Sequence, residues 1–110
     1  MQPRIDSGSV AGRLERIGYY KYYLLIYHVV DDYVARRTPF RERHIRLARE
    51  AHDRGEIILG GALEDPVDKA LLVFSCEDPK VVETFVREDP YVQNGLIAKW
   101  EIRPWNVVIH

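Results

Sequence analysis

The residue best suited to acid–base chemistry in this chain of 110 residues is His44. It falls on the apolar face of a predicted helix, between Phe40 and Leu47. Imidazole changes its protonation near neutral pH, so a histidine that faces a pocket can act as a general base or acid. The alternative is a core histidine satisfied by a backbone carbonyl, because buried polar groups are nearly always hydrogen-bonded. The group that is hydrogen-bonded to the imidazole would distinguish a catalytic histidine from a core histidine.

A working imidazole needs a group that fixes its tautomer and stabilises its cation, and a carboxylate does both. Among the 17 acidic residues, Asp89 has the best context, because it follows the second predicted helix, near one end of the first. Its segment, DPYVQNG, is also typical of a helix N-cap followed by a single turn. The two roles are compatible, since a carboxylate has about four acceptor positions. One oxygen can accept from the N–H of Tyr91 or Val92 while the other binds His44.

Three further residues are candidates for substrate contact. Arg41 lies on the flank of the same helix face, where it either binds an anionic oxygen or is solvated. Gly60 opens a Gly-Gly step that lets a ligand approach the backbone, or else marks a bulge or bend. Tyr91, together with Trp100 and Trp105, could line a pocket for an aromatic ligand, although such residues also build cores.

The chain carries no signature of a metal or an organic cofactor. Its one cysteine, Cys76, excludes an intramolecular disulfide, and no Cys/His set has zinc-binding spacing. The sequence contains no GxGxxG, Walker loop or GxSxG, so nucleotide-binding and serine-hydrolase functions lack support. We expect neither a metal nor a cofactor, and a reducing, cytoplasmic location.

The composition is that of a globular domain without a strongly charged partner. Apolar residues make up 46% of the chain, charged residues 30%, and the formal net charge is −1. Nucleic-acid and anionic-membrane partners favour a clustered basic face, which this balance does not indicate. Apolar runs such as YYLLIYHVV are too short to span a bilayer. We therefore expect a small-molecule ligand or substrate, with neither nucleic acid nor membrane as partner.

The spacing of apolar residues predicts two helices among four strands. Segment 39–55 is the clearest helix, with Pro39 in its first turn and Gly55 just past its end. Its other face pairs opposite charges four residues apart, which is typical of a solvated helix surface. Segment 31–38 is expected to be a polar link, and Asp78 and Pro79 open a second helix. Strands are predicted over 22–30, 56–63 and 69–76, the last two as a hairpin, and over 96–110 with an irregular or edge extension.

The resulting order is β-α-β-β-α-β, the split β-α-β or ferredoxin-like arrangement of an α+β domain, with an antiparallel sheet and both helices on one face. Strand 22–30 is apolar on both faces, so the face without helices needs another cover. A second copy packed sheet against sheet would supply it, and we expect a homodimer. We also expect a flexible N-terminal extension, 1–21, before a single domain, 22–110.

Five segments match the pattern of a known family from residue 22 to 109, in order and without large gaps: YYLLIYHVV, RERHIRLAREAHDRGEIILGGAL, ALLVFSCED, FVREDPYVQNGL and WEIRPWNVV. The most specific pieces are Arg-x-x-His with the later Gly-Gly step, and Asp-Pro-Tyr-Val-x-x-Gly-Leu. On these segments the chain resembles the YciI-like (YCII-related) proteins. The N-terminal extension lies outside the resemblance.

That resemblance implies a ferredoxin-like fold, a dimeric α+β barrel with the sheets face to face, and a pocket around a His–Asp pair proposed to be catalytic. Carried over to this sequence, the pair is His44 and Asp89. One characterised relative is similar to a dehydrochlorinase that acts on a chlorinated hydroxyquinone without metal or organic cofactor. Most members have no assigned reaction, so the resemblance supports the site more than any substrate.

The leading hypothesis is a small cofactor-independent enzyme with lyase or dehydrochlorinase-like acid/base chemistry on a small, aromatic or quinone-like molecule. His44 would be the base or acid and Asp89 its orienting partner, with Arg41, Tyr91 and Gly60 in contact with the substrate. One alternative is a non-enzymatic ligand-binding or sensor domain that uses the same pocket. Others are a cofactorless monooxygenase of aromatic compounds, or a structural role in which the pair is only a buried hydrogen bond.

Overall fold

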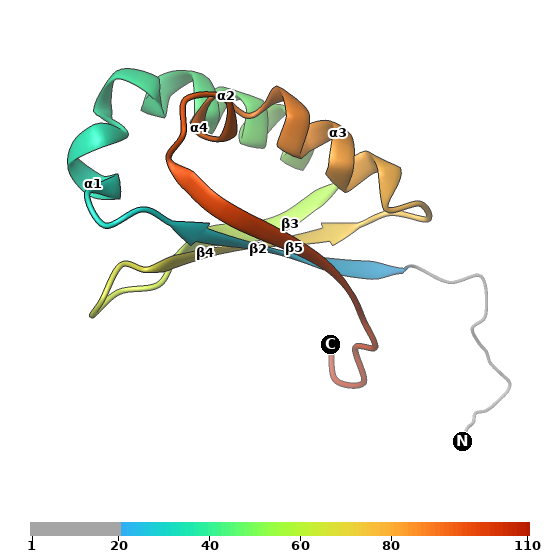
Figure 1. Ribbon diagram of the computed structural model, residues 1–110. Coiled ribbons are helices and arrows are strands. Elements are labelled where there is room, and N and C mark those ends of the chain that lie inside the picture. Colours follow the sequence, from blue (N-terminus) through green and yellow to red (C-terminus); the bar gives the residue numbers. More distant parts are fainter. Residues whose placement is uncertain (1–20) are drawn as a thin grey trace, which may run out of the picture.

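The computed structural model describes residues 21–110 as two layers, a four-stranded antiparallel sheet and a layer of helices on one of its faces (Figure 1). The strand order is β3-β4-β2-β5, and every neighbouring pair is antiparallel. This is the ferredoxin-like α+β fold predicted from the element order. Its elements are β2 (Tyr22–Val29), α1 (Tyr33–Arg36), α2 (Thr38–Asp53), β3 (Ile57–Ala62), β4 (Lys69–Ser75), α3 (Lys80–Glu88), α4 (Pro90–Gln93) and β5 (Ile97–Trp105).

The helix α1 is the one element that the sequence did not predict. The segment 31–38 was expected to be a polar link, but Tyr33 is only 4% exposed and anchors one helical turn to the core. A single buried aromatic residue among polar neighbours produces no hydrophobic periodicity, which is why the pattern missed it.

The long helices begin and end where their sequences predict. Pro39 lies in the first turn of α2, and Gly55 follows its end at a φ of +82°, a left-handed conformation that glycine adopts without steric cost. In α3, Val82, Phe85 and Val86 recur at helical spacing and are buried. Apolar spacing thus sets which face of each helix meets the sheet.

The hydrophobic core lies between the sheet and the helices. Side chains of a strand alternate between its two faces, so every second residue of β2 and β4 points to the helix layer. A fully buried aliphatic or aromatic side chain of this kind stabilises the fold by about 1.5–3 kcal/mol. Among residues 21–110, Asp89 is the one buried polar or charged side chain. The core includes Tyr23, Leu25, Tyr27, Leu72, Phe74, Val82, Phe85, Val86 and Leu96.

The opposite face of the sheet is apolar at its centre, and no helix of residues 21–110 covers it (Figure 1). Leu24 pairs with Val73 and Ile26 with Leu71 across β2 and β4, and all four are only partly buried. Leu59 of β3 lies opposite Val73 and is 64% exposed. We call this surface the open face.

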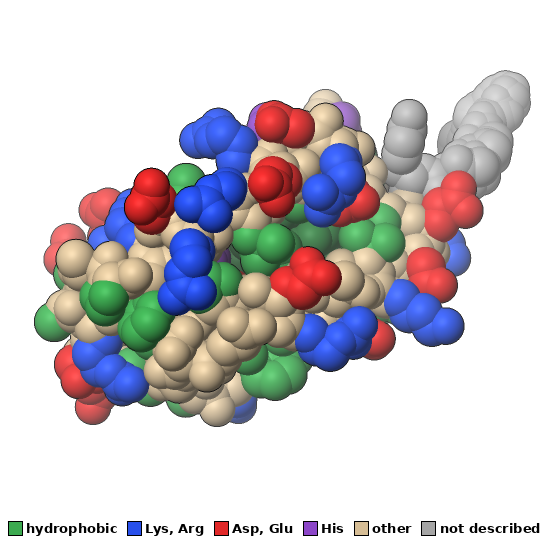
Figure 2. Space-filling model, turned by 90° about the horizontal axis from the view of Figure 1, so that it is seen from above, with side chains coloured by type: hydrophobic (Ala, Val, Ile, Leu, Met, Phe, Trp, Pro, Cys, Tyr) green, Lys and Arg blue, Asp and Glu red, His purple; other side chains and the backbone are tan. Residues whose placement is uncertain are grey.

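The helix layer, in contrast, presents mixed charge. Figure 2, viewed onto this layer, shows Lys and Arg side chains interspersed with Asp and Glu. Alternating charges of this kind are typical of a solvated surface, whereas nucleic-acid binding favours a clustered basic face.

Of the predicted N-terminal extension, residues 1–20 lie outside the described residues, so that boundary stays a prediction. Lys21 is described, and its carbonyl oxygen accepts a hydrogen bond from the Cys76 N–H over 3.0 Å. Within residues 21–110, no helix has the length and apolar character needed to cross a bilayer.

Candidate active site

His44 and Asp89 meet where α2 lies against the short helix α4. His44 Nδ1 is 2.8 Å from Asp89 Oδ1, and the two side chains are 13% and 0% exposed. Because a carboxylate can only accept a hydrogen bond, Nδ1 carries the proton and Nε2 keeps a free lone pair. The structure therefore brings together the two residues that the sequence paired.

The carboxylate of Asp89 accepts three hydrogen bonds. Oδ1 accepts from the backbone N–H of Tyr91 over 2.9 Å as well as from His44, and Oδ2 accepts from the Tyr27 hydroxyl over 2.7 Å. The expected division, one oxygen for the helix cap and one for the imidazole, was wrong, since Oδ1 serves both. The other oxygen, Oδ2, accepts from Tyr27 of the sheet instead. The three donors satisfy both oxygens of this fully buried carboxyl group.

Tyr27 is the residue of this group that sequence reasoning missed. It lies on the helix-facing side of β2, in alternation with Tyr23 and Leu25, so its position predicted a core residue and nothing marked its hydroxyl. Burial, followed by the negative charge of Asp89 and the hydrogen bond to it, raises the pKa of Tyr27 far above its usual range. The hydroxyl is therefore a neutral donor to Asp89.

Tyr91 fixes the plane of the imidazole. Its ring stacks on that of His44 with centroids 3.8 Å apart and an angle of 10° between the planes. Tyr33 meets the same tyrosine edge-on, at 5.6 Å and 88°, a favourable geometry for aromatic pairs. The His44 ring is thus held both by a hydrogen bond at its edge and by a stacked ring at its face.

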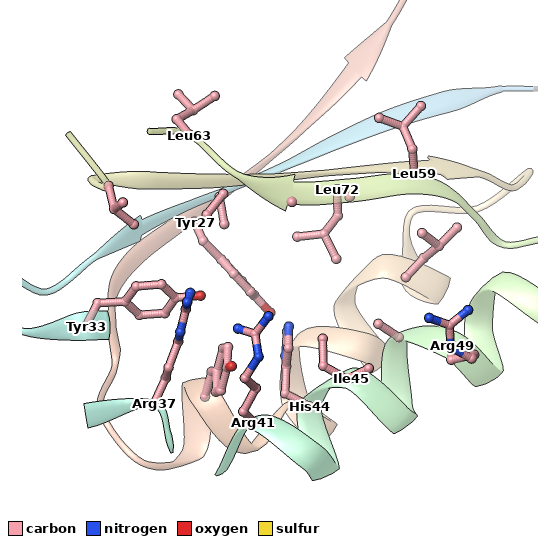
Figure 3. A pocket seen from close by; sticks show the side chains of 18 of the residues that line it. Tyr27, Tyr33, Arg37, Arg41, His44, Ile45, Arg49, Leu59, Leu63 and Leu72 are labelled. Carbon is pink, nitrogen blue, oxygen red and sulfur yellow. The ribbon is translucent and has the colours of Figure 1, made fainter. Parts of the chain in front are cut away.

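A cavity of about 570 Å³ lies between α2 and the sheet and extends to the edge strand β3 (Figure 3). This is within the range of small-molecule sites, about 300–1,000 Å³. The predicted residues Arg41, Tyr91 and Gly60 all line it together with His44. Trp100 and Trp105 do not line it, and both are 46% exposed on β5.

The Gly-Gly step forms part of the cavity wall without a bulge of its own. Gly60 and Gly61 pair in register with β4, and the irregularity of β3 falls earlier, between Ile57 and Leu59. The expectation of a bulge at the glycines was therefore wrong. A Cβ atom on Gly60 would lie 3.2 Å from Cγ of Leu72. A side chain at Gly60 would therefore crowd Leu72 in the cavity wall.

Within residues 21–110, no three His, Cys, Asp or Glu side chains are arranged to hold a metal ion. The other histidines near acids or carbonyls have local roles. His52 Nδ1 lies 2.8 Å from the carbonyl oxygen of Ile57. On the open face, His28 Nε2 lies 2.9 Å from a carboxylate oxygen of Glu101 and lowers the pKa of that carboxyl.

Comparison with known proteins identifies the family of the chain. In a search of solved structures, the chain is similar to 5-chloro-2-hydroxyhydroquinone dehydrochlorinase (TftG) from Burkholderia phenoliruptrix AC1100 in complex with 2,5-dihydroxybenzoquinone. The two share 18% sequence identity and a TM-score of 0.66, over 77% of this chain and 93% of the other. This likeness shows the fold. No curated protein matches the chain in sequence. The family model of the YCII-related domain matches residues 20–106, and the chain therefore belongs to the YCII-related family.

Proposed function

We propose that this protein is a small cofactor-independent enzyme in which His44 and Asp89 carry out acid/base chemistry of the lyase or dehydrochlorinase type. The observation that carries the proposal is the 2.8 Å bond from Nδ1 of His44 to a fully buried carboxylate, beside a cavity of about 570 Å³. A general base must have one fixed tautomer and must face the space where a reactant binds. His44 lines the cavity, and Nε2 is its free nitrogen.

The proposed step is an elimination. Nε2 of His44 accepts a proton from a carbon or oxygen of the substrate, and the electron pair left behind forms a new double bond. The bond to the leaving group breaks at the same time, and the leaving group departs with its electrons, as chloride does in dehydrochlorination. The imidazolium that forms is stabilised by Asp89 and returns its proton to water.

The surroundings of Asp89 support this role. The three hydrogen bonds to its oxygens hold the carboxylate in place as a charged acceptor, so the imidazole cannot turn to another tautomer without losing a partner. General acid–base catalysis contributes about 10²–10⁴-fold to a rate. The remainder would come from positioning the substrate against Nε2. Arg41, Tyr91 and Gly60 are the proposed substrate contacts in the cavity wall.

The proposed substrate is a small aromatic or quinone-like molecule. Aromatic rings of Tyr91 and Tyr33 and aliphatic side chains such as Leu72 line the cavity, which suits a planar apolar ring. The similar solved structure is that of a dehydrochlorinase holding 2,5-dihydroxybenzoquinone, which supports this class of substrate for the present chain.

The enzyme is proposed to act as a homodimer. The central residues of the open face are apolar, and Leu59 is 64% exposed there. A second sheet packed face to face would bury this surface, as in dimeric α+β barrels.

The test is release of chloride from chlorinated hydroxyquinones, measured with the full chain and with the His44→Gln and Asp89→Asn variants. Turnover by the wild-type protein, lowered about 10²-fold or more in each variant, is expected. Asp78→Asn is the matched control, since Asp78 also precedes a proline, accepts from a backbone N–H at the start of a helix and does not line the cavity. Wild-type-like turnover in a folded His44→Gln protein would overturn the proposal. Saturable ligand binding without turnover would favour the sensor alternative.

A further inference from the structure

We propose that the cavity selects planar anions, and that Arg37, Arg41 and the hydroxyl of Tyr91 form an oxyanion-binding subsite beside His44. The inference rests on the proposed function and names the substrate class of the same cavity: an aromatic or quinone-like ring that bears a carboxylate or another ionised oxygen.

The first observation is a missing hydrogen bond. Tyr91 is 1% exposed and lines the cavity, and its hydroxyl forms no hydrogen bond of good geometry within residues 21–110. The Arg41 guanidinium interacts with this hydroxyl only as a donor, so the hydroxyl proton has no acceptor. Burying a hydroxyl without a partner is costly, and such groups are rare in native proteins. A ligand oxygen in the cavity would supply the acceptor.

The second observation is the charge around that hydroxyl. Burial and then the nearby Tyr33 raise the pKa of Tyr91, while the positive charges of Arg41 and Arg37 and a hydrogen-bonding contact with Arg41 oppose this increase. The hydroxyl is therefore a neutral donor that lies close to two cations. Donors and cations that converge on one point form a site for an oxyanion.

The third observation is that no acid neutralises either positive charge within the described residues. No acid of residues 21–110 forms an ion pair with Arg37 or Arg41, whereas the adjacent Arg36 pairs with Asp32. The guanidinium of Arg37 instead lies over the Tyr33 ring, 5.1 Å from its centroid. Both free guanidinium groups remain available to bind a ligand.

Their spacing brings them to the reacting group. Arg37, Arg41 and His44 are four and three residues apart, which places them on one side of a helix. Figure 3 shows all three side chains extending from the helix toward the sheet, where Tyr27 projects between them and the strands. An anion held by the arginines would therefore lie beside the imidazole.

The position of the arginines argues against a purely structural role. They lie at the start of α2, and the first turn of that helix contains no acidic residue. The N-terminus of a helix carries partial positive charge, so cations there are unfavourable for helix stability and anions are favourable. A bound anion would offset the repulsion between the arginines and the positive N-terminus of α2.

The rest of the cavity fits the same class of ligand. Among the described residues, three arginines line the cavity, Arg37, Arg41 and Arg49. Glu64 is the one acidic residue there, so the lining carries an excess of positive charge. Arg binds carboxylates in a bidentate manner and stacks on aromatic faces, so it suits an aromatic acid better than a simple ion. Apolar residues such as Leu72 line the space beyond.

The inference is tested with two pairs of probes of nearly equal shape: 2,5-dihydroxybenzoate and its methyl ester, and benzoate and benzamide. Affinities are measured by titration calorimetry for the wild-type full chain and for Arg37→Gln, Arg41→Gln and Tyr91→Phe. Arg46→Gln is the matched control, because Arg46 is an exposed arginine of α2 that does not line the cavity.

We expect the wild-type protein to bind each anion about tenfold or more tightly than its neutral counterpart. Arg41→Gln and Tyr91→Phe should remove most of this preference, Arg37→Gln part of it, and Arg46→Gln none. The melting temperature should stay the same or rise in Tyr91→Phe, which loses a buried hydroxyl without an acceptor, and should fall slightly in Arg37→Gln, which loses its contact with the Tyr33 ring. Equal affinity for anions and neutral probes, no saturable anion binding, or an unchanged preference in Arg41→Gln and Tyr91→Phe would overturn the inference.

The His44→Gln variant separates this inference from the proposed function. If both hold, this variant loses chloride release but keeps the preference for anions. Turnover by the wild-type protein without an anion preference would reject the subsite alone. An anion preference without any turnover would reject the proposed enzyme and leave the subsite standing.

Discussion

His44 donates a 2.8 Å hydrogen bond to Oδ1 of Asp89, and this is the same oxygen that caps α4. Forming the single turn of α4 therefore also aims the carboxylate at the imidazole. A helix cap and the alignment of a proposed catalytic base depend on one atom, which links local folding of residues 89–95 to the geometry of the cavity.

Removing the two aspartates that bind backbone N–H groups at the starts of α3 and α4 should have unequal effects on stability. Oδ1 of Asp78 accepts from the Lys80 N–H over 2.9 Å at an exposed site, so Asp78→Ala should cost about 1 kcal/mol. Asp89→Ala removes a similar bond to a backbone N–H and also leaves two more donors, the buried Tyr27 and the partly buried His44, without their acceptor. We expect a loss of about 3–5 kcal/mol in the free energy of unfolding. Urea denaturation measures both, and equal losses would contradict the role of Asp89 as a shared acceptor.

The Tyr27 hydroxyl should matter for stability and for the precision of the pair. Tyr27→Phe removes the one donor to Oδ2 of Asp89, and hydrogen bonds to charged groups contribute about 1.5–3 kcal/mol. Turnover should fall less than in His44→Gln, because His44 keeps its bond to Oδ1. Tyr23→Phe is the matched control, since Tyr23 lies on the same face of β2 and its hydroxyl forms no hydrogen bond within residues 21–110. Identical unfolding curves for the two variants would refute this role of Tyr27.

The buried tyrosine also predicts how stability responds to alkaline pH. In the folded chain the pKa of Tyr27 is raised, chiefly by burial and then by Asp89, whereas an unfolded tyrosine titrates near 10. Above about pH 10 the unfolded chain loses a proton that the folded chain retains, so stability is full below that pH and falls as pH rises further, by about 1.4 kcal/mol per pH unit for this group. Tyr27→Phe should show a shallower decline in denaturation experiments across this range. The same slope in both proteins would rule out Tyr27 as the source.

The pairing of His44 with Asp89 could be predicted because both positions follow from local rules. Helical spacing places His44 among Phe40 and Leu47, and the Asp-Pro start with Gly95 defines a capped turn. The β-α-β-β-α-β order then brings the ends of the two helices together. These local rules made Asp89 the best placed of many acids, and the resemblance to the YciI-like proteins then singled it out as the partner of His44.

Tyr27 and Arg37 could not be predicted in the same way. The role of Tyr27 depends on which group its buried hydroxyl binds. Strand alternation predicts only that the side chain faces the core and says nothing of that partner. Arg37 fell in a segment expected to be a polar link, whereas it directly precedes α2 and lines the cavity. Both roles arise from contacts between elements that are distant in the sequence, and a periodic pattern does not contain them.

A charge at the centre of the open face should separate the proposed dimer. Val73 on β4 lies opposite Leu24 on one side and Leu59 on the other. A glutamate at this position would have to be buried against the partner sheet without a compensating group, which is strongly unfavourable. Val73→Glu should therefore sediment as a folded monomer, while the wild-type chain sediments as a dimer. Val34→Glu, at a residue of α1 that is 49% exposed in the helix layer, should remain dimeric. A dimeric Val73→Glu protein would mean that the copies meet at another surface, and that the apolar centre of the open face is covered in some other way.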